Sequence, residues 1–227
     1  MTDLLTDLTI VTGHYGSGKT NLSVNLALDF KRQGKDVVLI DLDIVNPYFR
    51  SADFAGLMER SGIQLLAPLY ANTNLDIPAL TPQISAAFSQ QGKTLVVDVG
   101  GDDSGAIALG RYAPAIQARD YRLLYVIHAY RYLRDGVDDT VSLLREIEAV
   151  SRLKAYGLVN NSNLGSETSP QDVLDSLPYA ANCAAQCGVP LLAHAVRRET
   201  AEALEGRLPD VYPVDVYVRA PWDSMEF

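Results

Sequence analysis

The 227-residue sequence contains little cysteine and histidine, and fewer basic than acidic residues. It has two cysteines and three histidines, and its 19 lysine and arginine residues stand against 28 acidic ones, which gives a formal net charge of −9. Two cysteines cannot build the disulfide framework typical of small secreted proteins. The negative charge argues against a broad nucleic-acid-binding face, so we expect that nucleic acid is not a partner.

The two cysteines, Cys183 and Cys187, stand four residues apart in a predicted helix. A structural zinc site needs about four ligands, and the histidines His14, His128 and His194 are scattered along the chain. The pattern therefore favours two reduced, semi-buried thiols over half of a metal site that a second subunit completes.

Long hydrophobic runs are also missing. No segment approaches the roughly 18 uninterrupted apolar residues that cross a bilayer. The first seven residues are acidic and lack the layout of a signal peptide, and residues 220–227 do not form a basic amphipathic helix. We therefore expect no membrane anchor and a cytoplasmic location. Apolar residues make up 48% of the chain, and we expect residues 1–227 to form one nucleotide-binding domain.

Residues 13–20, Gly-His-Tyr-Gly-Ser-Gly-Lys-Thr, match the phosphate-loop pattern G-x-x-x-x-G-K-[ST]. In this pattern glycines let main-chain N–H groups point at phosphate oxygens, the lysine reaches the β- and γ-phosphates, and the hydroxyl binds Mg²⁺. An apolar, β-branched run precedes the loop and a helical pattern follows it. The predicted cofactor-binding residues here are Gly13, His14, Tyr15, Gly16, Ser17, Gly18, Lys19, Thr20 and Asn21.

Short apolar runs alternate with helix-like segments along the chain. The runs are almost wholly apolar, which indicates burial on both faces and therefore an α/β fold with a mainly parallel, doubly wound sheet of about seven strands. The predicted strands are 8–12, 37–42, 63–67, 94–99, 122–128, 155–160 and 190–195. The predicted helices are 19–33, 48–60, 80–91, 104–118, 136–151, 170–187 and 199–205.

Acidic residues follow two of these strands, at the edge where parallel sheets bind ligands. Asp98 ends a strand and precedes a glycine pair, which is typical of a carboxylate that holds Mg²⁺ directly or through water. Gly101 can bring its N–H close to a γ-phosphate because it lacks a Cβ atom. Asp41 and Asp43 should point the same way, one toward the metal and one toward the attacking water. The alternatives are a capping aspartate at Asp98 and a solvated strand-end carboxylate at Asp43.

Together these motifs resemble the ParA/MinD-type P-loop ATPases, a group that includes the nitrogenase iron protein and the CobQ/CobB nucleotide-binding domains. The likeness covers residues 8 to about 200. It rests on the phosphate loop and on the later segments Leu39–Asp43, Val96–Gly101, Gly157–Ser162 and Gly188–Leu192. The resemblance implies a Mg-ATP-dependent switch that cycles between ATP and ADP, acts on a protein partner, and often works as an ATP-dependent homodimer.

By match to the family's motifs, Lys19 and Thr20 would be the phosphate and Mg²⁺ residues. Asp43 would be the aspartate that orients the water, and Asp98 the second metal-linked carboxylate. The predicted catalytic residues are therefore Lys19 and Asp43, and the predicted metal residues are Thr20, Asp41, Asp43 and Asp98.

One position departs from the family's pattern. The family usually has a lysine directly after the first glycine of the loop, where it reaches the partner's nucleotide, and this chain has His14. A neutral imidazole carries no permanent charge. We therefore expect slow hydrolysis and a weak ATP-dependent dimer with His14 and Tyr15 at its interface. The alternatives are a biosynthetic ligase of the CobQ/dethiobiotin synthetase type and a nucleotide-binding adaptor that does not hydrolyse ATP.

The stretch after the strand 155–160 bears on the choice of base. Guanine-specific P-loop proteins usually carry Asn-Lys-x-Asp there, and residues 160–163 of this chain contain no acid. Asn161 and Ser162 resemble the Asn-Ser pair that contacts adenine in iron-protein-like members, although Asn161 could instead form a turn. We predict ATP over GTP. Residues 46–50, which follow Asp43, are a candidate switch segment.

Overall fold

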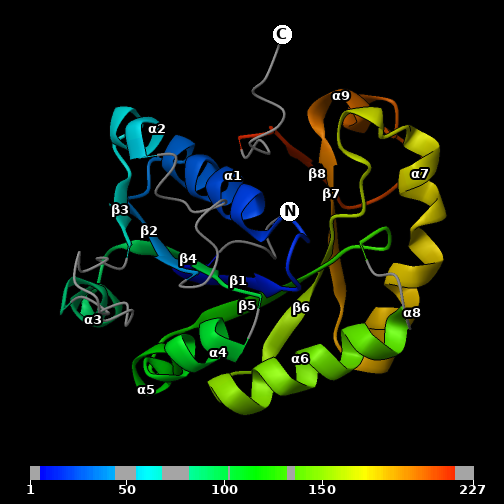
Figure 1. Cartoon of the computed structure of the whole chain (residues 1–227). Coiled ribbons are helices and arrows are strands. Elements are labelled where there is room, and N and C mark those ends of the chain that lie inside the picture. The colour runs from blue at the N-terminus through cyan, green and yellow to red at the C-terminus, as the bar shows by residue number, and fades with distance from the viewer. Residues whose placement is uncertain (1–5, 44–54, 68–81, 102, 132–135, 218–227) are drawn as a thin grey trace, which may run out of the picture.

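The computed structural model describes residues 6–43, 55–67, 82–101, 103–131 and 136–217. In these residues the strands form one eight-stranded sheet in the order β3-β2-β4-β1-β5-β6-β7-β8 (Figure 1), and every neighbouring pair is parallel. The strands are β1 (Leu8–Gly13), β2 (Val37–Leu42), β3 (Gln64–Leu66), β4 (Thr94–Val99), β5 (Tyr121–Ile127), β6 (Ala155–Asn160), β7 (Leu191–Arg197) and β8 (Val211–Val214).

Helices lie on both sides of this sheet, as the apolar strands predicted. Helices α1 and α2 lie on one side, and α3, α4 and α5 on the other (Figure 1). The helices are α1 (Lys19–Arg32), α2 (Ala55–Arg60), α3 (Pro82–Ser89), α4 (Asp103–Gly110), α5 (Ala113–Gln117), α6 (Val137–Ser151), α7 (Pro170–Asp175), α8 (Leu177–Cys187) and α9 (Arg198–Glu202).

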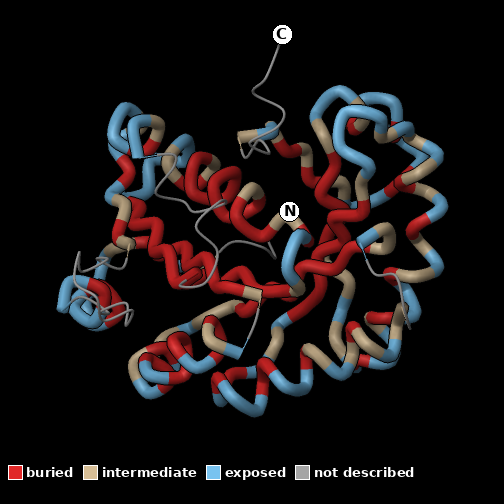
Figure 2. Tube along the Cα trace, in the orientation of Figure 1, coloured by how far each residue is buried: buried red, intermediate tan, exposed pale blue. Residues whose placement is uncertain are grey.

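Successive residues of the central strands are buried in different clusters. In β2, Leu39 packs in the cluster that contains α1, whereas Val38 and Ile40 pack in the cluster that contains α3 and α5. Figure 2 shows the strands buried along most of their length, with exposed residues on the outer sides of the helices. Burial on both faces explains why the strands read as continuous apolar runs.

The sheet has one strand more than the seven that the sequence predicted. The additional strand, β8, pairs with β7 in parallel at the edge of the sheet. The strand includes Pro213, and proline cannot donate to a ladder. At an edge, however, one side of the strand has no ladder partner, so the missing N–H is tolerated.

Two predicted helices are each divided into two. The prediction 104–118 is occupied by α4 and α5, and the prediction 170–187 by α7 and α8. The second helix of each pair carries a proline in its first turn, Pro114 and Pro178 respectively. Proline fits a helix start and disrupts a helix interior. The candidate switch segment 46–50 and residues 48–54 of the predicted helix 48–60 lie outside the described residues.

Cys183 and Cys187 lie on α8, where both are buried free thiols. Burial raises the pKa of Cys183 to about 11, so this thiol stays protonated and unreactive at neutral pH. Within the described ranges, no helix has the length and apolar character needed to cross a membrane.

Candidate nucleotide-binding site

The phosphate loop connects β1 to α1 at the carboxyl edge of the sheet, and its shape depends on glycine. Gly13 and Gly18 have φ angles of 149° and 87°, in the region that side chains rarely adopt. A Cβ atom on Gly13 would lie 2.3 Å from the carbonyl oxygen of Val126 in β5, and one on Gly18 would lie 2.1 Å from Nδ2 of Asn161. The loop is therefore packed tightly against the ends of its neighbouring strands.

Lys19 is the first residue of α1 and is buried within the loop. Its Nζ donates a hydrogen bond to the carbonyl oxygen of His14 at 2.9 Å, and the main-chain N–H of Ser17 donates to the same oxygen at 3.1 Å. The loop thus curls around the lysine ammonium group. This arrangement places a positive charge and several main-chain N–H groups where a phosphate chain would bind.

Asp98 lies beneath the start of α1, as the sequence predicted. Its Oδ1 accepts a hydrogen bond from the Ser23 hydroxyl at 3.2 Å, and the Thr20 side chain also hydrogen-bonds to the carboxylate. Burial raises the pKa of Asp98 to about 6, and the charge of Asp43 adds to the rise. The hydrogen bond from Thr20 and the charge of Lys19 act in the opposite direction. These interactions bring the phosphate loop and both acidic strand ends together.

Asp41 stands beside Asp98 in the register of β2 and β4. Its Oδ1 accepts the main-chain N–H of Asp43 at 2.9 Å, and its side chain is fully buried. Asp41 therefore stabilises the turn that positions Asp43, so its role in the structure is a structural one. Its predicted role as a metal residue stays a prediction.

Gly101 follows β4 and contacts the phosphate loop directly. A Cβ atom on Gly101 would lie 2.6 Å from the carbonyl oxygen of Gly13 and 2.6 Å from the main-chain nitrogen of Tyr15. The absence of a side chain thus lets the end of β4 approach the first turn of the loop. The close approach of Gly101 to the loop is observed, whereas the predicted contact of its N–H with a γ-phosphate stays a prediction.

Asn161, after β6, also contacts the phosphate loop. Its Nδ2 donates to the carbonyl oxygen of Ser17 at 2.7 Å, and its own N–H donates to the carbonyl oxygen of Ile127 at 2.9 Å. The neighbouring Ser162 is turned inward: its hydroxyl accepts from the N–H of Ala129 and donates to Asn160. The predicted contact of Ser162 with the base therefore stays a prediction, and its hydroxyl already has partners.

Asn21 holds the segment after β8. Its Nδ2 donates to the carbonyl oxygen of Asp215 at 3.0 Å, and its Oδ1 accepts from the N–H of Tyr217 at 2.8 Å. Asn25, one turn later, makes two further hydrogen bonds to the main chain of Asp215. This segment was not predicted from the sequence, although two asparagines four apart on one helix face could have indicated a backbone partner.

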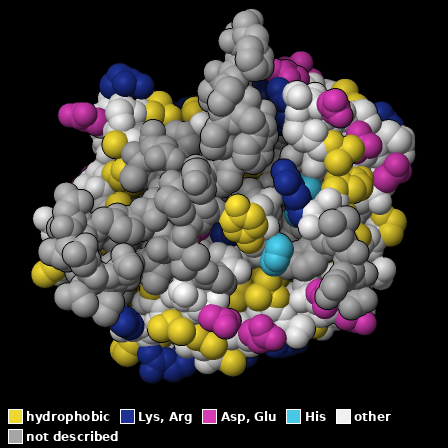
Figure 3. Space-filling model, in the orientation of Figure 1, with side chains coloured by type: hydrophobic (Ala, Val, Ile, Leu, Met, Phe, Trp, Pro, Cys, Tyr) yellow, Lys and Arg dark blue, Asp and Glu magenta, His cyan; other side chains and the backbone are white. Residues whose placement is uncertain are grey.

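His14 and Tyr15 lie at the outer side of the loop. Tyr15 is 56% exposed, and burial, together with the charge of Lys19, lowers the pKa of His14. In Figure 1, helix α1 begins near the middle of the view. Figure 3 shows the same face of the molecule: histidine, hydrophobic and basic side chains lie near its centre, and most acidic side chains lie toward its rim. The exposed tyrosine and the neutral histidine leave Lys19 as the charged side chain of the loop itself.

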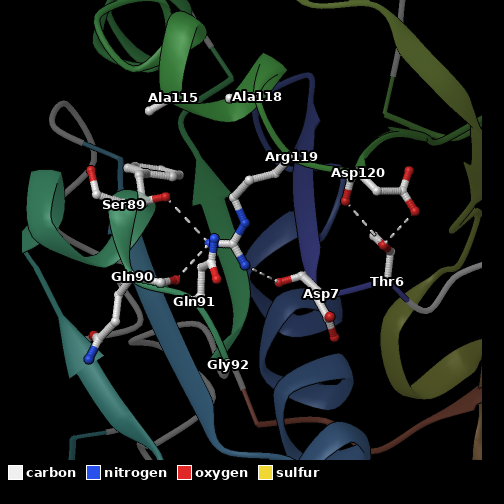
Figure 4. A pocket seen from close by; sticks show the side chains of 11 residues that line it. Thr6, Asp7, Ser89, Gln90, Gln91, Gly92, Ala115, Ala118, Arg119 and Asp120 are labelled. Carbon is white, nitrogen blue, oxygen red and sulfur yellow. Dashed lines mark hydrogen bonds between the residues drawn. The ribbon is translucent and has the colours of Figure 1, made fainter.

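A cavity of about 480 Å³ lies at the opposite, amino edge of the sheet (Figure 4). It is lined by residues that precede β1, β4 and β5, such as Asp7, Gly92 and Asp120. Arg119 crosses it and donates hydrogen bonds to the main-chain carbonyl oxygens of Asp7, Phe88, Gln90 and Lys93. Arg119 thus links these segments, and the cavity is the gap left between them. The cavity is remote from the phosphate loop.

Comparison with solved structures finds the same fold in FtsY proteins. FtsY from Mycoplasma mycoides is 15% identical with a TM-score of 0.57, over 86% of this chain and 61% of that one. The signal recognition particle receptor FtsY from Elizabethkingia anophelis in complex with GDP is 18% identical with a TM-score of 0.54, over 83% of this chain and 57% of that one. FtsY from Thermotoga maritima is 19% identical with a TM-score of 0.52, over 92% and 65%.

This chain therefore spans less than two thirds of the length of these proteins. At such identities the likeness concerns the fold alone. Comparison with curated protein sequences gives no match.

The family model for the CobQ/CobB/MinD/ParA nucleotide binding domain matches residues 8–205. The match begins at the first residue of β1 and continues past α9. It includes the phosphate loop, Asp98, Gly101 and Asn161, and it confirms the resemblance on which the sequence prediction rested. The chain belongs to the CobQ/CobB/MinD/ParA nucleotide-binding family of P-loop proteins.

Proposed function

We propose that this protein binds Mg-ATP and hydrolyses it slowly, and that its nucleotide state controls its interaction with a protein partner. The observation that carries the proposal is the convergence of Lys19, Thr20, Asp43 and Asp98 at the start of α1. The lysine and hydroxyl of a phosphate loop, with one carboxylate bonded to that hydroxyl and a second near the first, are the parts that phosphoryl transfer requires. The single-domain organisation of residues 1–227 belongs to the same proposal.

Phosphate binding would use the loop as it stands. Lys19 now donates to the carbonyl oxygen of His14, and this donor can turn to the β- and γ-phosphates without moving the backbone. The N–H of Gly101 would reach the γ-phosphate from the end of β4. Gly101 already lies against the loop. Loss of the γ-phosphate would therefore remove a contact of Gly101 and change the position of the residues that follow it, as in switch proteins whose segments are ordered by the γ-phosphate.

The same residues fit a magnesium ion. Mg²⁺ usually takes one or two carboxylates, phosphate oxygens and several waters rather than an all-protein cage. Within the described ranges no group of three or more His, Cys, Asp or Glu side chains could hold a metal ion by itself. Thr20, with Asp98 and Asp43 directly or through water, would hold Mg²⁺, which would neutralise phosphate charge there. Asp43 would orient the attacking water.

The preference for adenine rests on the residues after β6. Asn161 is the asparagine that contacts the phosphate loop, so the acid of the pattern Asn-Lys-x-Asp would stand three residues later, at Leu164. That side chain is apolar and 46% exposed. A leucine cannot accept hydrogen bonds from the N1 and amino groups of guanine. The described segment after β6 therefore lacks the acid that would favour GTP, which supports the proposed preference for ATP.

Calorimetry with ATP and GTP tests this preference. The wild-type protein should bind ATP more tightly, and Leu164→Asp should shift the ratio of the two dissociation constants toward GTP by roughly tenfold, because a polar partner for the guanine edge discriminates strongly. Val150→Asp, at an exposed apolar position on α6, is the matched control and should leave the ratio unchanged. Tighter GTP binding by the wild type would refute the adenine assignment.

A nucleotide-binding adaptor that does not hydrolyse ATP is the second candidate, and His14 is the observation that favours it. Burial lowers the pKa of His14, so the side chain is neutral at pH 7 and brings no charge to a partner's phosphates. Phosphate release separates the candidates. Slow basal turnover supports the switch, no turnover supports the adaptor, and turnover only with an added carboxylate substrate would support a biosynthetic ligase instead.

A further inference from the structure

We infer that a buried cluster formed by Asn160, Ser162, Ser176 and His194 positions Asn161, the residue predicted to contact the base, and thereby contributes to nucleotide selectivity. The inference rests on the proposed function. The cluster lies where the end of β6 and the middle of β7 meet the junction of α7 and α8. All four side chains are buried, with exposed fractions of 2%, 4%, 1% and 6% in the order given.

Asn160 is the centre of the cluster. Its Oδ1 accepts the main-chain N–H of Ser162 at 3.2 Å and the Ser162 hydroxyl at 2.6 Å. Since a main-chain N–H can only donate, these contacts fix which end of the amide is the oxygen. The Nδ2 group then donates to the Ser176 hydroxyl at 2.9 Å and contacts Nδ1 of His194 at 3.1 Å.

This orientation sets the tautomer of His194. Because Nδ2 of Asn160 is a donor, Nδ1 of His194 must accept, and the imidazole proton is on Nε2. Ser176 is satisfied as well, because it donates to the carbonyl oxygen of Val173 at 2.7 Å. A buried network in which every member has a partner is rigid, and one missing partner weakens all of it.

The rigid cluster acts on the residue between two of its members. Asn161 stands between Asn160 and Ser162, and its side chain points to the phosphate loop through its bond to Ser17. The turn that the Asn160 amide closes therefore determines where the Asn161 amide lies. Truncating a cluster member should loosen Asn161 while leaving Lys19 and Thr20, which lie on α1, in place.

The ratio of the dissociation constants for ATP and GTP isolates this effect. Both nucleotides carry the same ribose triphosphate. A change in affinity for the triphosphate therefore alters both dissociation constants equally and cancels in their ratio. His194→Leu removes the acceptor for Asn160 and should reduce the preference for ATP by roughly fivefold to tenfold, the size expected for one buried hydrogen bond. His194→Asn retains an acceptor near the position of Nδ1 and should restore the wild-type ratio to within about twofold.

Ser176→Ala provides a smaller change if His194→Leu does not fold, and it should shift the ratio in the same direction. An equal loss of ATP and GTP affinity, or an unchanged ratio in both folded variants, would overturn the inference while leaving the proposed function intact. A wild-type protein that binds neither nucleotide would overturn both. Thermal melting without nucleotide shows which variants are folded.

Discussion

At the scale of single residues, the phosphate loop is fixed by neighbours from other strands. Gly101 presses on its first turn, Asn161 holds the carbonyl oxygen of Ser17, and Asp98 accepts from residues at the start of α1. Each of these contacts depends either on the absence of a side chain at a glycine or on a buried hydrogen bond. The loop is therefore shaped before a nucleotide arrives, which lowers the entropic cost of binding.

Gly101→Ala tests the close approach of β4 to the loop. The added Cβ atom would meet main-chain atoms 2.6 Å away, which cannot move as a flexible side chain would. We expect the variant to lose about 1–3 kcal/mol of stability, as overpacked sites do, and to bind ATP more weakly because the loop is displaced. Chemical denaturation and calorimetry measure the two effects.

The matched control is Gly56→Ala in α2. A Cβ atom there would lie 3.3 Å from the end of the Arg60 side chain, which can move. Alanine is also the better helix former, so this variant should be neutral or slightly stabilised. Wild-type stability and ATP affinity in Gly101→Ala would show that the loop has room for a side chain.

The buried side chain of His128 should make the free energy of unfolding depend on pH. It is buried after β5, its Nδ1 accepts the N–H of Tyr130 at 3.2 Å, and burial, with the charge of Arg131, lowers its pKa from 6.5 to about 4. The folded state therefore resists protonation that the unfolded state accepts. The free energy of unfolding should be highest above pH 6.5 and should fall toward pH 4, by up to about 3 kcal/mol from this residue.

Urea denaturation between pH 7.5 and pH 4 measures this dependence. His128→Asn cannot take up a proton and keeps an acceptor for Tyr130, so it should show a clearly smaller loss of stability across that range. His128→Asn and the wild type losing stability in parallel would mean that other groups cause the acid sensitivity.

At the scale of elements, β8 and the three residues that follow it are tied to the start of α1. Asn21 and Asn25 bind the main chain of Asp215 and Tyr217. Arg198, the first residue of α9, forms a two-contact ion pair with Asp215, both at 2.9 Å. The helix that follows the phosphate loop is thus linked to the last described strand, about 190 residues later in the chain.

Asn25→Ala should loosen this link. The variant loses the bonds from Asn25 Nδ2 to the carbonyl oxygen of Asp215 and from the N–H of Asp215 to Asn25 Oδ1, each 2.9 Å long. We expect a loss of about 1–3 kcal/mol of stability and faster amide exchange in residues 211–217. Ser89→Ala, which removes a long and exposed bond of 3.3 Å, should change neither. Unchanged exchange in Asn25→Ala would show that pairing with β7 alone holds β8.

The sequence predicted most elements because their signals are local. Seven strands lie close to their expected positions, since a strand buried on both faces needs a run of apolar residues whatever surrounds it. β8 was not predicted: its four residues include Pro213, and only its place at the sheet edge makes that proline acceptable. The breaks before α5 and α8 could have been predicted, because Pro114 and Pro178 mark them in the sequence.

The site was predictable to the extent that one motif specifies it. The pattern of the loop and the acid at the end of β4 indicated Lys19, Thr20 and Asp98, which the structure brings together. The inward turn of Ser162 could not be predicted from the local pattern, because its hydroxyl accepts a hydrogen bond from Ala129, which follows β5 and is 33 residues away along the chain. The same holds for His194, whose role depends on a contact across the sheet.

At the scale of the whole molecule, the strength of an ATP-dependent dimer should depend on the charge of the side chain at position 14 of the phosphate loop. If the proposed function holds, ATP should bring two copies together with their phosphate loops facing, and His14 and Tyr15 would lie between them. The neutral His14 contributes no charge to the partner's phosphates, so the dimer should be weak. His14→Lys should strengthen it through a charge-assisted contact.

Light scattering on the variant Asp43→Ala, which should hydrolyse ATP more slowly if Asp43 orients the attacking water, measures this assembly. The mean mass should rise with ATP and not with ADP, and it should rise further when His14→Lys is added. Tyr156, which is also exposed but lies on β6, gives the control variant Tyr156→Ala. The same mass with both nucleotides, with or without His14→Lys, would show that this chain does not form the facing dimer.

Binding of Mg-ATP to wild-type protein and to Lys19→Ala, followed by calorimetry, tests the central claim most directly. Lys35, an exposed lysine whose nearest ionic partner is 3.6 Å away, supplies the matched control Lys35→Ala. The account predicts a measurable affinity for the wild type, the same affinity for Lys35→Ala, and a loss of at least about 30-fold for Lys19→Ala, because a charge-assisted contact with the phosphates disappears. Equal binding by Lys19→Ala and the wild type would contradict the assignment of this loop as the nucleotide site.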